Sequence, residues 1–334
     1  MLKDRLIGGR KTRTFTLQWH LTNACPFHCR HCYDRSERGQ LELADALGIL
    51  AAFQRFCTRH RAAGRISLSG GDPLWYPGFW ELYQTIADAW LPVSILGNPI
   101  SRAIAERLVG IQMPQYYQVS LEGLPDYNDS IRGRGHFAQV VTFLEAAREL
   151  RLRTHVMLTL HAGNQAQVIP LGEYLRGLTQ RLSFNRLAQV GEGAGMTVPD
   201  RTEYAAFADH YLAARRHNPL LGLKDGLLNI HLRQRGHRTF GGCTGFGCGA
   251  AFNFVALLPN GEVHACRKFP SLLGNAVEED FEAIYFSRAA KEYRRGSKSC
   301  RSCRLSKVCG GCMAVVHGQG GRVLQDRDPQ CFVE

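Results

Sequence analysis

The sequence predicts an α/β fold built around a parallel sheet. Short apolar runs alternate with longer segments of helical period from about Thr14 to His217. The alternation repeats about six times, which is typical of strands that are each followed by a helix outside the sheet. With 45% apolar and 21% charged residues in 334, the chain can fill about two globular domains. This pattern leaves an open barrel, a closed barrel and a doubly wound sheet as alternatives.

Each expected strand is a run rich in Val, Ile, Leu or Phe. These runs are residues 15–21, 65–69, 93–96, 117–121, 154–160 and 182–188. Between them, apolar residues recur on one stripe of a helix. Two such stripes are Leu43, Leu47, Leu50, Phe53 and Cys57, and then Phe137, Val141, Leu144 and Ala147. In folds of this kind we expect the chemistry at the carboxyl ends of the strands.

The regular alternation stops after His217. Gly, Arg and Cys become dense there, so we expect loops and short hairpins held by something other than a large core. Residues 252–258 and 262–266, joined by the turn at 259–261, predict a hairpin. We therefore expect one domain over residues 1–217 and a second over 218–334.

Composition limits the cellular setting and the partners. No apolar run approaches the roughly 20 residues that cross a bilayer, and the first 14 residues lack a hydrophobic signal core. We therefore expect a cytoplasmic protein without a membrane partner. The net charge of +12 arises from Lys and Arg scattered among acidic residues, which is unlike a nucleic-acid site. A substrate that is an acidic peptide or another carboxylate-bearing molecule would explain the positive net charge equally well.

Twelve cysteines are unusual in such a chain. In a reducing compartment, clustered cysteines are more often metal ligands or catalytic groups than disulfides. Cys25, Cys29 and Cys32 follow the first expected strand directly. Three thiolates on one loop can hold three corners of an iron-sulfur cubane and leave the fourth iron open to a ligand. A zinc site completed by His28 or His31 is the alternative.

The spacing Cys25-x3-Cys29-x2-Cys32, followed by Tyr33, resembles the signature of the radical S-adenosylmethionine superfamily. The resemblance implies a partial (β/α)6 TIM-like barrel with a 4Fe-4S cluster near its mouth. It further implies that the open iron binds S-adenosylmethionine, whose reductive cleavage yields a 5'-deoxyadenosyl radical that abstracts hydrogen from substrate.

Other positions resemble the superfamily's S-adenosylmethionine contacts. Gly70, Gly71, Asp72 and Pro73 resemble its glycine-rich turn, with Asp72 where Glu is usual. By the same resemblance Asn98 meets the ribose, and Ser120 and Arg132 contact the ribose and the methionine carboxylate. Taken singly, each of these residues also suits an ordinary surface loop.

The last hundred residues hold a second cysteine group that resembles a SPASM domain, although Gly310-Gly311 shortens its last spacing by one residue. The resemblance implies two auxiliary 4Fe-4S clusters. The first is implied to use Cys243, Cys248, Cys266 and Cys312, and the second Cys300, Cys303, Cys309 and Cys331. A zinc ribbon is the alternative. Cys57 and His264 are expected to be structural residues, in the first helix and in the hairpin.

The residue after Cys266 helps to choose among SPASM enzymes. Sulfatase maturases carry a catalytic aspartate there, whereas this chain has Arg267. The chain more closely resembles maturases of ribosomally made peptides, of the selenobiotic or geopeptide type. Arg134, Arg267 and Lys268 are candidate contacts with an acidic peptide, although solvated surface charges explain them more simply.

The resemblance implies three partners, namely a precursor peptide, a reductant such as flavodoxin or ferredoxin, and a leader-recognition element. The first strand begins near Phe15, so we expect the barrel rim, the auxiliary domain or a separate protein to read the leader. Two alternatives stay open, a radical enzyme acting on a haem- or quinone-type precursor and a non-enzymatic iron-sulfur or zinc protein. Thioether formation, epimerisation, crosslinking and oxidation all use this apparatus, so no particular bond is implied.

Overall fold

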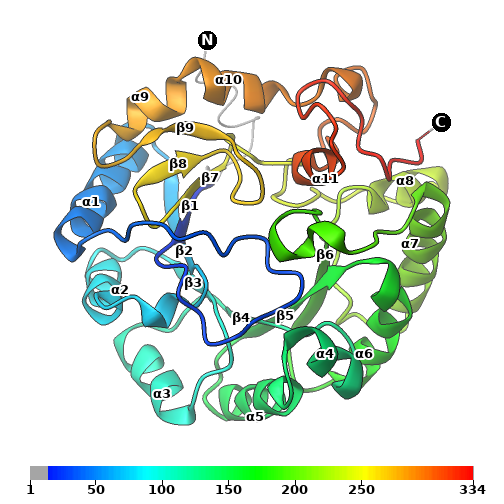
Figure 1. The fold of residues 1–334 in the computed structure, drawn as a ribbon, viewed down its shortest axis with the longest axis horizontal. Helices are drawn as coiled ribbons and strands as arrows, with labels where there is room; N and C mark the ends of the chain where they lie inside the picture. Colours follow the sequence, from blue (N-terminus) through cyan, green and yellow to red (C-terminus); the bar gives the residue numbers. More distant parts are fainter. Residues whose placement is uncertain (1–13, 334) are drawn as a thin grey trace.

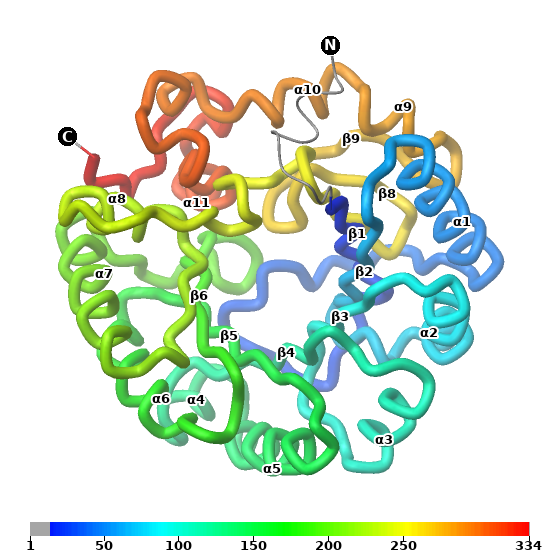
Figure 2. The backbone as a smooth tube through the Cα atoms, turned by 180° about the vertical axis from the view of Figure 1, so that it is seen from behind, coloured from blue at the N-terminus to red at the C-terminus, as the bar shows by residue number. Residues whose placement is uncertain are grey.

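The computed structural model describes residues 14–333. Its strands curve around a central space and its helices lie outside them, as Figures 1 and 2 show from opposite sides. The strands are β1 (Thr14–His20), β2 (Ala63–Ser69), β3 (Val93–Leu96), β4 (Tyr117–Ser120), β5 (Thr154–Leu160), β6 (Arg181–Arg186), β7 (Phe254–Leu257), β8 (Glu262–His264) and β9 (Leu272–Asn275). The helices are α1 (Leu43–Arg59), α2 (Phe79–Asp88), α3 (Arg102–Ile111), α4 (Pro125–Arg132), α5 (His136–Glu149), α6 (Val168–Tyr174), α7 (Arg201–Arg215), α8 (Leu228–Gln234), α9 (Phe281–Phe286), α10 (Arg288–Arg295) and α11 (Met313–Gly318).

One sheet runs through the molecule in the order β6-β5-β4-β3-β2-β1-β7-β8-β9. Strands β1 to β7 pair in parallel, and β8 and β9 add antiparallel neighbours. The six strands predicted from the sequence are all present, within two residues at each end. The α/β class and the partial barrel are therefore confirmed, and the doubly wound alternative is excluded because the helices cover only the outer face (Figure 1).

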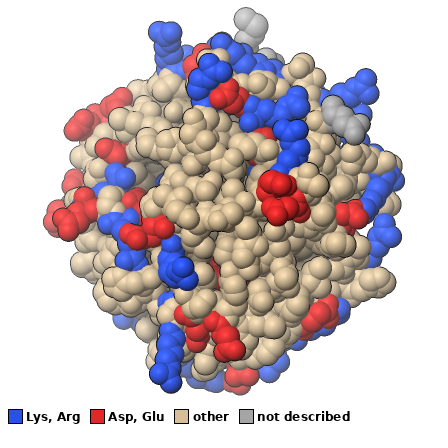
Figure 3. Space-filling view, turned by 45° about the vertical axis from the view of Figure 1, so that its right-hand side comes forward, with Lys and Arg blue, Asp and Glu red and all other residues tan. Residues whose placement is uncertain are grey.

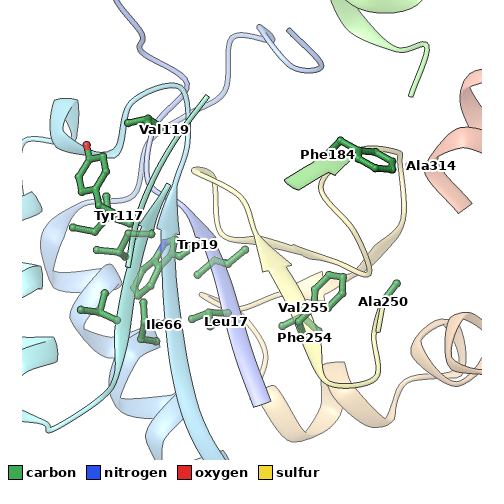
Figure 4. Packing of buried hydrophobic residues seen from close by; sticks show 14 of the residues in the cluster. Leu17, Trp19, Ile66, Tyr117, Val119, Phe184, Ala250, Phe254, Val255 and Ala314 are labelled. Atoms are coloured by element: carbon green, nitrogen blue, oxygen red, sulfur yellow. The ribbon is translucent and has the colours of Figure 1, made fainter. Parts of the chain in front are cut away.

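Strand β1 shows why the barrel is hollow. Phe15, Leu17 and Trp19 are buried on its outer face, against the helices. Gln18 and His20 alternate with them and line the interior cavities. The same period of two recurs in the neighbouring strands, where outward apolar residues such as Ile66 form the core (Figure 4). The sheet thus buries one apolar face and keeps a polar interior.

Helix α1 joins the two parts of the chain through aromatic contacts. Phe56 lies 5.4 Å from both Phe15 of β1 and Tyr285 of α9, measured between ring centroids. Phe53 lies 5.9 Å from Phe281 in an edge-on arrangement. Cys57, on the same helix, is buried, as expected for a core residue. In the second predicted stripe, Val140 rather than Val141 is the fully buried valine.

The last third is more regular than the sequence suggested. The predicted hairpin is present as β7 and β8, with Gly261 at a φ of +85° in the turn. Strand β7 pairs with β1 along Thr16↔Phe254 to Trp19↔Leu257. The expectation that this region lacks a share in a large core is wrong, because Phe281 and Tyr285 belong to the main cluster of buried residues.

No helix of residues 14–333 has the length and apolarity needed to cross a membrane. On the surface, basic and acidic side chains are interspersed with one another (Figure 3). On the face in Figure 3, blue Lys and Arg side chains alternate with red Asp and Glu side chains around a largely uncharged centre. This distribution agrees with the expectation from the sequence that the positive charge is scattered rather than gathered into one patch.

A buried ion network fastens the C-terminal segment to β6. Arg186 donates two hydrogen bonds to Asp328, at 2.8 and 2.6 Å, and one to Asp225 at 2.7 Å. Its Nη1 also reaches Gln330 at 2.7 Å. Burial alone would raise the pKa of Asp328, but Arg186 holds that pKa below its usual value, so the carboxylate stays charged.

The network predicts a large stability difference between two nearby aspartates. Asp328→Asn leaves the buried guanidinium short of one countercharge and should lower the free energy of unfolding by about 3 kcal/mol. Asp326→Asn is the matched control, because its partner Arg322 is exposed, and it should cost at most about 1 kcal/mol. Anaerobic urea unfolding followed by circular dichroism measures both. Equal effects would contradict the assigned role of Arg186.

Candidate functional site

The loop that follows β1 carries the first cysteine group into a cavity at the carboxyl ends of the parallel strands, which we call the upper chamber. Cys25, Cys29 and Cys32 line one cavity of about 410 Å³ together with the carboxyl ends of the strands. The register His20↔Ser69 brings the loops after β1 and β2 to the same level. The predicted residues that also line this cavity are Tyr33, Gly70, Gly71, Asn98, Ser120 and Arg132.

Gly70 and Gly71, after β2, hold in place the loop that carries Cys25, Cys29 and Cys32, which we call the cluster loop. The amide of Gly71 donates to the carbonyl of Thr22 at 2.7 Å, and that of Asp72 donates to the carbonyl of Ala24 at 2.8 Å. A Cβ on Gly71 would overlap the carbonyl oxygens of Ala24 and Asn23. The sequence suggested glycine for close approach to a ligand, and the structure adds close approach to the cysteine loop itself.

Asp72 and Pro73 do not line the cavity. Asp72 is buried behind Asn98 and accepts a hydrogen bond from its amide at 3.0 Å. The same amide lies 3.6 Å from the Cys25 sulfur. Pro73 begins a short 3-10 turn, in which Asp72 caps the amide of Leu74 at 3.1 Å. Asp72 therefore orients Asn98 toward the cavity.

Glu122, after β4, is a functional residue that the sequence did not reveal. Its fully buried carboxylate accepts hydrogen bonds from Arg132 at 2.6 and 2.9 Å and lies 2.8 Å from His31 Nε2. Burial alone would raise the pKa of Glu122, but His31 and Arg132 lower it, so Glu122 is an anion. Arg132 Nη1 points to the Cys29 sulfur at 3.6 Å. Glu122 thus positions two basic groups beside the cysteine loop.

A glycine-rich turn after β6, Gly191–Gly195, closes the other side of the cysteine loop. The amide of Glu192 donates to the carbonyl of Cys32 at 2.8 Å. Gly191 has a φ of +57°, and a Cβ there would overlap the Tyr33 carbonyl. The glycine density of this segment was visible in the sequence, but nothing local connected it with a loop far earlier in the chain.

Tyr33 and His20 form a second pair of polar side chains that line the upper chamber. The Tyr33 hydroxyl lies 3.0 Å from His20 Nε2, and burial raises the pKa of Tyr33 to about 12. Arg267 lies beside the Tyr33 ring and, with Lys268, lines both this cavity and the one below. Arg267 and Lys268 are therefore not surface charges, and the simpler explanation given for them above is wrong. Arg134 is exposed, as expected for a solvated surface charge.

A lower chamber of about 480 Å³ continues from the upper one and holds part of the second cysteine group. Its lining cysteines are Cys243, Cys248, Cys266, Cys309 and Cys312. A smaller cavity near the C-terminus is lined by Cys300, Cys303, Cys309 and Cys331. Among these cysteines, Cys309 alone borders both cavities. His264 is bound within the hairpin, with its Nδ1 accepting from the Ser271 amide at 3.1 Å.

The donor set suits iron-sulfur clusters. Burial raises the pKa of Cys248, and the neighbouring Cys312, Cys243 and Cys266 raise it further, so a bound cation would relieve this repulsion. Backbone amides donate to the sulfurs of Cys303 and Cys309 at 3.4 Å each, and such hydrogen bonds tune the reduction potential of an iron-sulfur cluster. All twelve cysteines are free of disulfides, so every thiol is available as a ligand.

Comparison with known families places two models on the chain. Residues 19–171 match the radical SAM superfamily, and residues 248–312 match SPASM, an iron-sulfur cluster-binding domain. The first range contains the loop of Cys25, Cys29 and Cys32, and the second runs from Cys248 to Cys312, so that Cys243 and Cys331 lie outside both.

Relatives and solved structures extend this similarity over nearly the whole chain. The mycofactocin maturase MftC of Mycobacterium ulcerans (strain Agy99) is 30% identical across 94% of this chain and 87% of its own. The AdoMet-dependent heme synthase of Methanosarcina barkeri (strain Fusaro / DSM 804) is 25% identical across 95% of both chains. The fold is similar to that of Streptococcus suis SuiB bound to precursor peptide SuiA, with a TM-score of 0.73 and 18% identity over 96% of this chain and 76% of SuiB.

The packing of Gly71 predicts an effect on the cluster loop. Gly71→Ala should push residues 23 and 24 away and lower both the iron bound by this loop and the rate of S-adenosylmethionine cleavage, the latter by roughly tenfold to a hundredfold. Gly39→Ala is the control, because nothing lies near its added methyl group. Iron analysis and chromatography of 5'-deoxyadenosine after anaerobic reconstitution measure the two effects. Full activity of the Gly71 variant would contradict this account.

Proposed function

The chain belongs to the radical SAM superfamily and carries a SPASM iron-sulfur domain, and from this we propose that it modifies a ribosomally made peptide. It is an enzyme of the S-adenosylmethionine and 4Fe-4S chemistry that these two domains define. The observation that carries the proposal is the continuous polar interior, which joins the three-cysteine loop to the cysteines of the lower chamber. The overall similarity to a mycofactocin maturase supports a peptide substrate.

We assign the cluster ligands from the cavities that the cysteines share. Cys25, Cys29 and Cys32 would hold the cluster with an open iron. The first auxiliary cluster would take Cys243, Cys248, Cys266 and Cys312, and the second would take Cys300, Cys303, Cys309 and Cys331. The lining of the lower chamber and of the C-terminal cavity supports this division. When bound, the open cluster and S-adenosylmethionine supply one-electron cleavage of a sulfonium and abstraction of a hydrogen atom.

The protein's own residues orient and enclose this chemistry. The backbone of Gly70 and Gly71 borders the upper cavity, where it would meet the amino group of S-adenosylmethionine. Arg132 is held by Glu122 on two of its nitrogens, which leaves Nη1 beside Cys29 for a carboxylate. Asn98 and Ser120 face the same space from β3 and β4, where they would meet the ribose.

A haem-pathway substrate is the second candidate. It is favoured by one observation, the similarity to the AdoMet-dependent heme synthase over 95% of both chains. For either substrate we propose a low-potential reductant such as flavodoxin or ferredoxin. For the peptide we add a leader-binding protein as a candidate partner.

Cysteine variants test the enzyme and its cluster ligands. After anaerobic reconstitution we expect about twelve irons per chain, little zinc, and 5'-deoxyadenosine when dithionite and S-adenosylmethionine are present. Cys25→Ala should abolish 5'-deoxyadenosine and remove about four irons, whereas Cys300→Ala should remove about four irons but keep some cleavage. Cys57→Ala is the control and should change neither quantity, because Cys57 packs in the core. Near-zero iron in the wild type would refute the proposal.

The substrate class is tested separately by mass. The chain is co-expressed with short peptides encoded beside its gene, and purified holoenzyme is incubated with iron coproporphyrin III. A mass change in a peptide, lost in Cys25→Ala, supports the first candidate. A change only in the tetrapyrrole supports the second and excludes the peptide.

A further inference from the structure

Arg267 occupies the junction between the two chambers. Six residues line both cavities and therefore mark this junction: Leu96, Gln118, Met157, Asn185, Arg267 and Lys268. A substrate that reaches the upper chamber while also facing the lower one must pass these side chains. Two of the six are cationic and none is acidic.

The turn that carries Arg267 is firmly anchored. The Ser271 hydroxyl donates to the carbonyl of Cys266 at 3.1 Å and accepts from its amide at 3.2 Å. Phe269 is buried and packs against Tyr293 at 5.9 Å. The guanidinium of Arg267 is therefore presented into the cavity by a fixed backbone rather than by a mobile loop.

Among residues 14–333, no carboxylate pairs with the guanidinium of Arg267, whose electrostatic neighbours are the Tyr33 hydroxyl and the thiols of Cys266 and Cys243. Its Nη1 donates to the neutral Gln18 Oε1 at 2.8 Å, and its Cζ lies 5.8 Å from the Tyr33 ring centroid. Its Nε is buried without a hydrogen-bond acceptor. A half-buried cation without a carboxylate partner is costly, and it costs more beside Lys268, which carries the same charge.

The acidic residues of the two chambers are engaged elsewhere. Asp225 accepts from Arg186 at 2.7 Å, and Asp34 lies 3.4 Å from Arg38. Lys268 has the cysteines of the lower chamber as electrostatic neighbours, namely Cys312, Cys266 and Cys243. Cys266 and Cys243 are neighbours of Arg267 as well, so neither of the two cations has a carboxylate partner among the described residues.

We propose that Arg267 is a specificity-determining residue that binds a carboxylate of the substrate at the junction of the chambers. Because Nη1 is bonded to Gln18 and Nε is enclosed, Nη2 is the nitrogen of Arg267 left to donate a charge-assisted hydrogen bond to a carboxylate. This inference rests on the proposed function and narrows it to a peptide segment with a free carboxylate, from either its C-terminus or an acidic side chain. S-adenosylmethionine also carries a carboxylate, so the test must separate these sources.

Calorimetry on the reconstituted holoenzyme, saturated with S-adenosylmethionine, tests this role of Arg267 without turnover. The probes are N-acetyl-dialanine with a free C-terminal acid and the same compound as its amide. The wild type should bind the acid at least about tenfold more tightly than the amide, as expected for a charge-assisted pair. Arg267→Gln should remove this preference, and Arg267→Lys should keep part of it. Arg134→Gln is the control, since that side chain is exposed, and should bind like the wild type.

Several outcomes would contradict the proposal that Arg267 binds a substrate carboxylate, which we call the carboxylate anchor. These are equal binding of acid and amide by the wild type, no detectable binding of the acid at 20 mM, or an unchanged preference in Arg267→Gln. A weaker affinity of Arg267→Gln for S-adenosylmethionine would assign Arg267 to that carboxylate instead. A shift in the reduction potential of an auxiliary cluster, with the acid preference intact, would assign it to the cluster.

The same assay separates the anchor from the proposed function. If no peptide changes mass but the acid preference depends on Arg267, the peptide proposal fails and the anchor stands. If a peptide is modified equally well after each of its carboxylates is converted to an amide, the anchor alone fails.

Discussion

Strand β1 is the element on which both halves of the molecule depend. It pairs in parallel with β2 on one side and with β7 on the other. Its pairing with β2 brings the three-cysteine loop beside the Gly70-Gly71 turn, and its pairing with β7 brings the hairpin with Cys266 to the interior. Because parallel strands end at a common edge, one register sets the relative height of the two chambers.

The strands also explain how a cavity can exist in a stable core. The outer face of the strands is apolar, so the hydrophobic contacts form mainly between the sheet and its ring of helices, and Leu96 and Met157 are apolar exceptions on the inner face. The inner face carries Gln18, His20, Gln118 and Ser120, which remain available to ligands. A barrel filled with apolar layers would have no such space. The hollow interior is therefore encoded in the alternation of residues along each strand.

Buried charges in this protein are of two kinds. Arg186 and Glu122 are each surrounded by opposite charges and hydrogen-bond partners, so their roles are structural or positional. Arg267 has an amide oxygen, an aromatic ring and the neighbouring thiols of Cys266 and Cys243, but no carboxylate partner among the described residues. An ion that is fully paired within the chain fastens elements together, whereas one that is partly paired within a cavity has capacity for a ligand.

Much of this protein could be predicted from local patterns. Short runs rich in Val, Ile, Leu or Phe predicted β1 to β6, and the spacing of Cys25, Cys29 and Cys32 predicted the site after the first of them. Both signals lie within a few neighbouring residues. The roles of Glu122, Gly191 and Arg267 could not be predicted in this way. Each acts on a partner far away in sequence, such as Glu122 on His31 or Arg267 on Gln18, and only strand pairing brings such partners together. The sequence spacing gave the number of cysteines in the second group, but only the tertiary structure shows which cavity each of them lines. Cys266 and Cys312 line the same cavity because β8 and α11 both pack against the barrel.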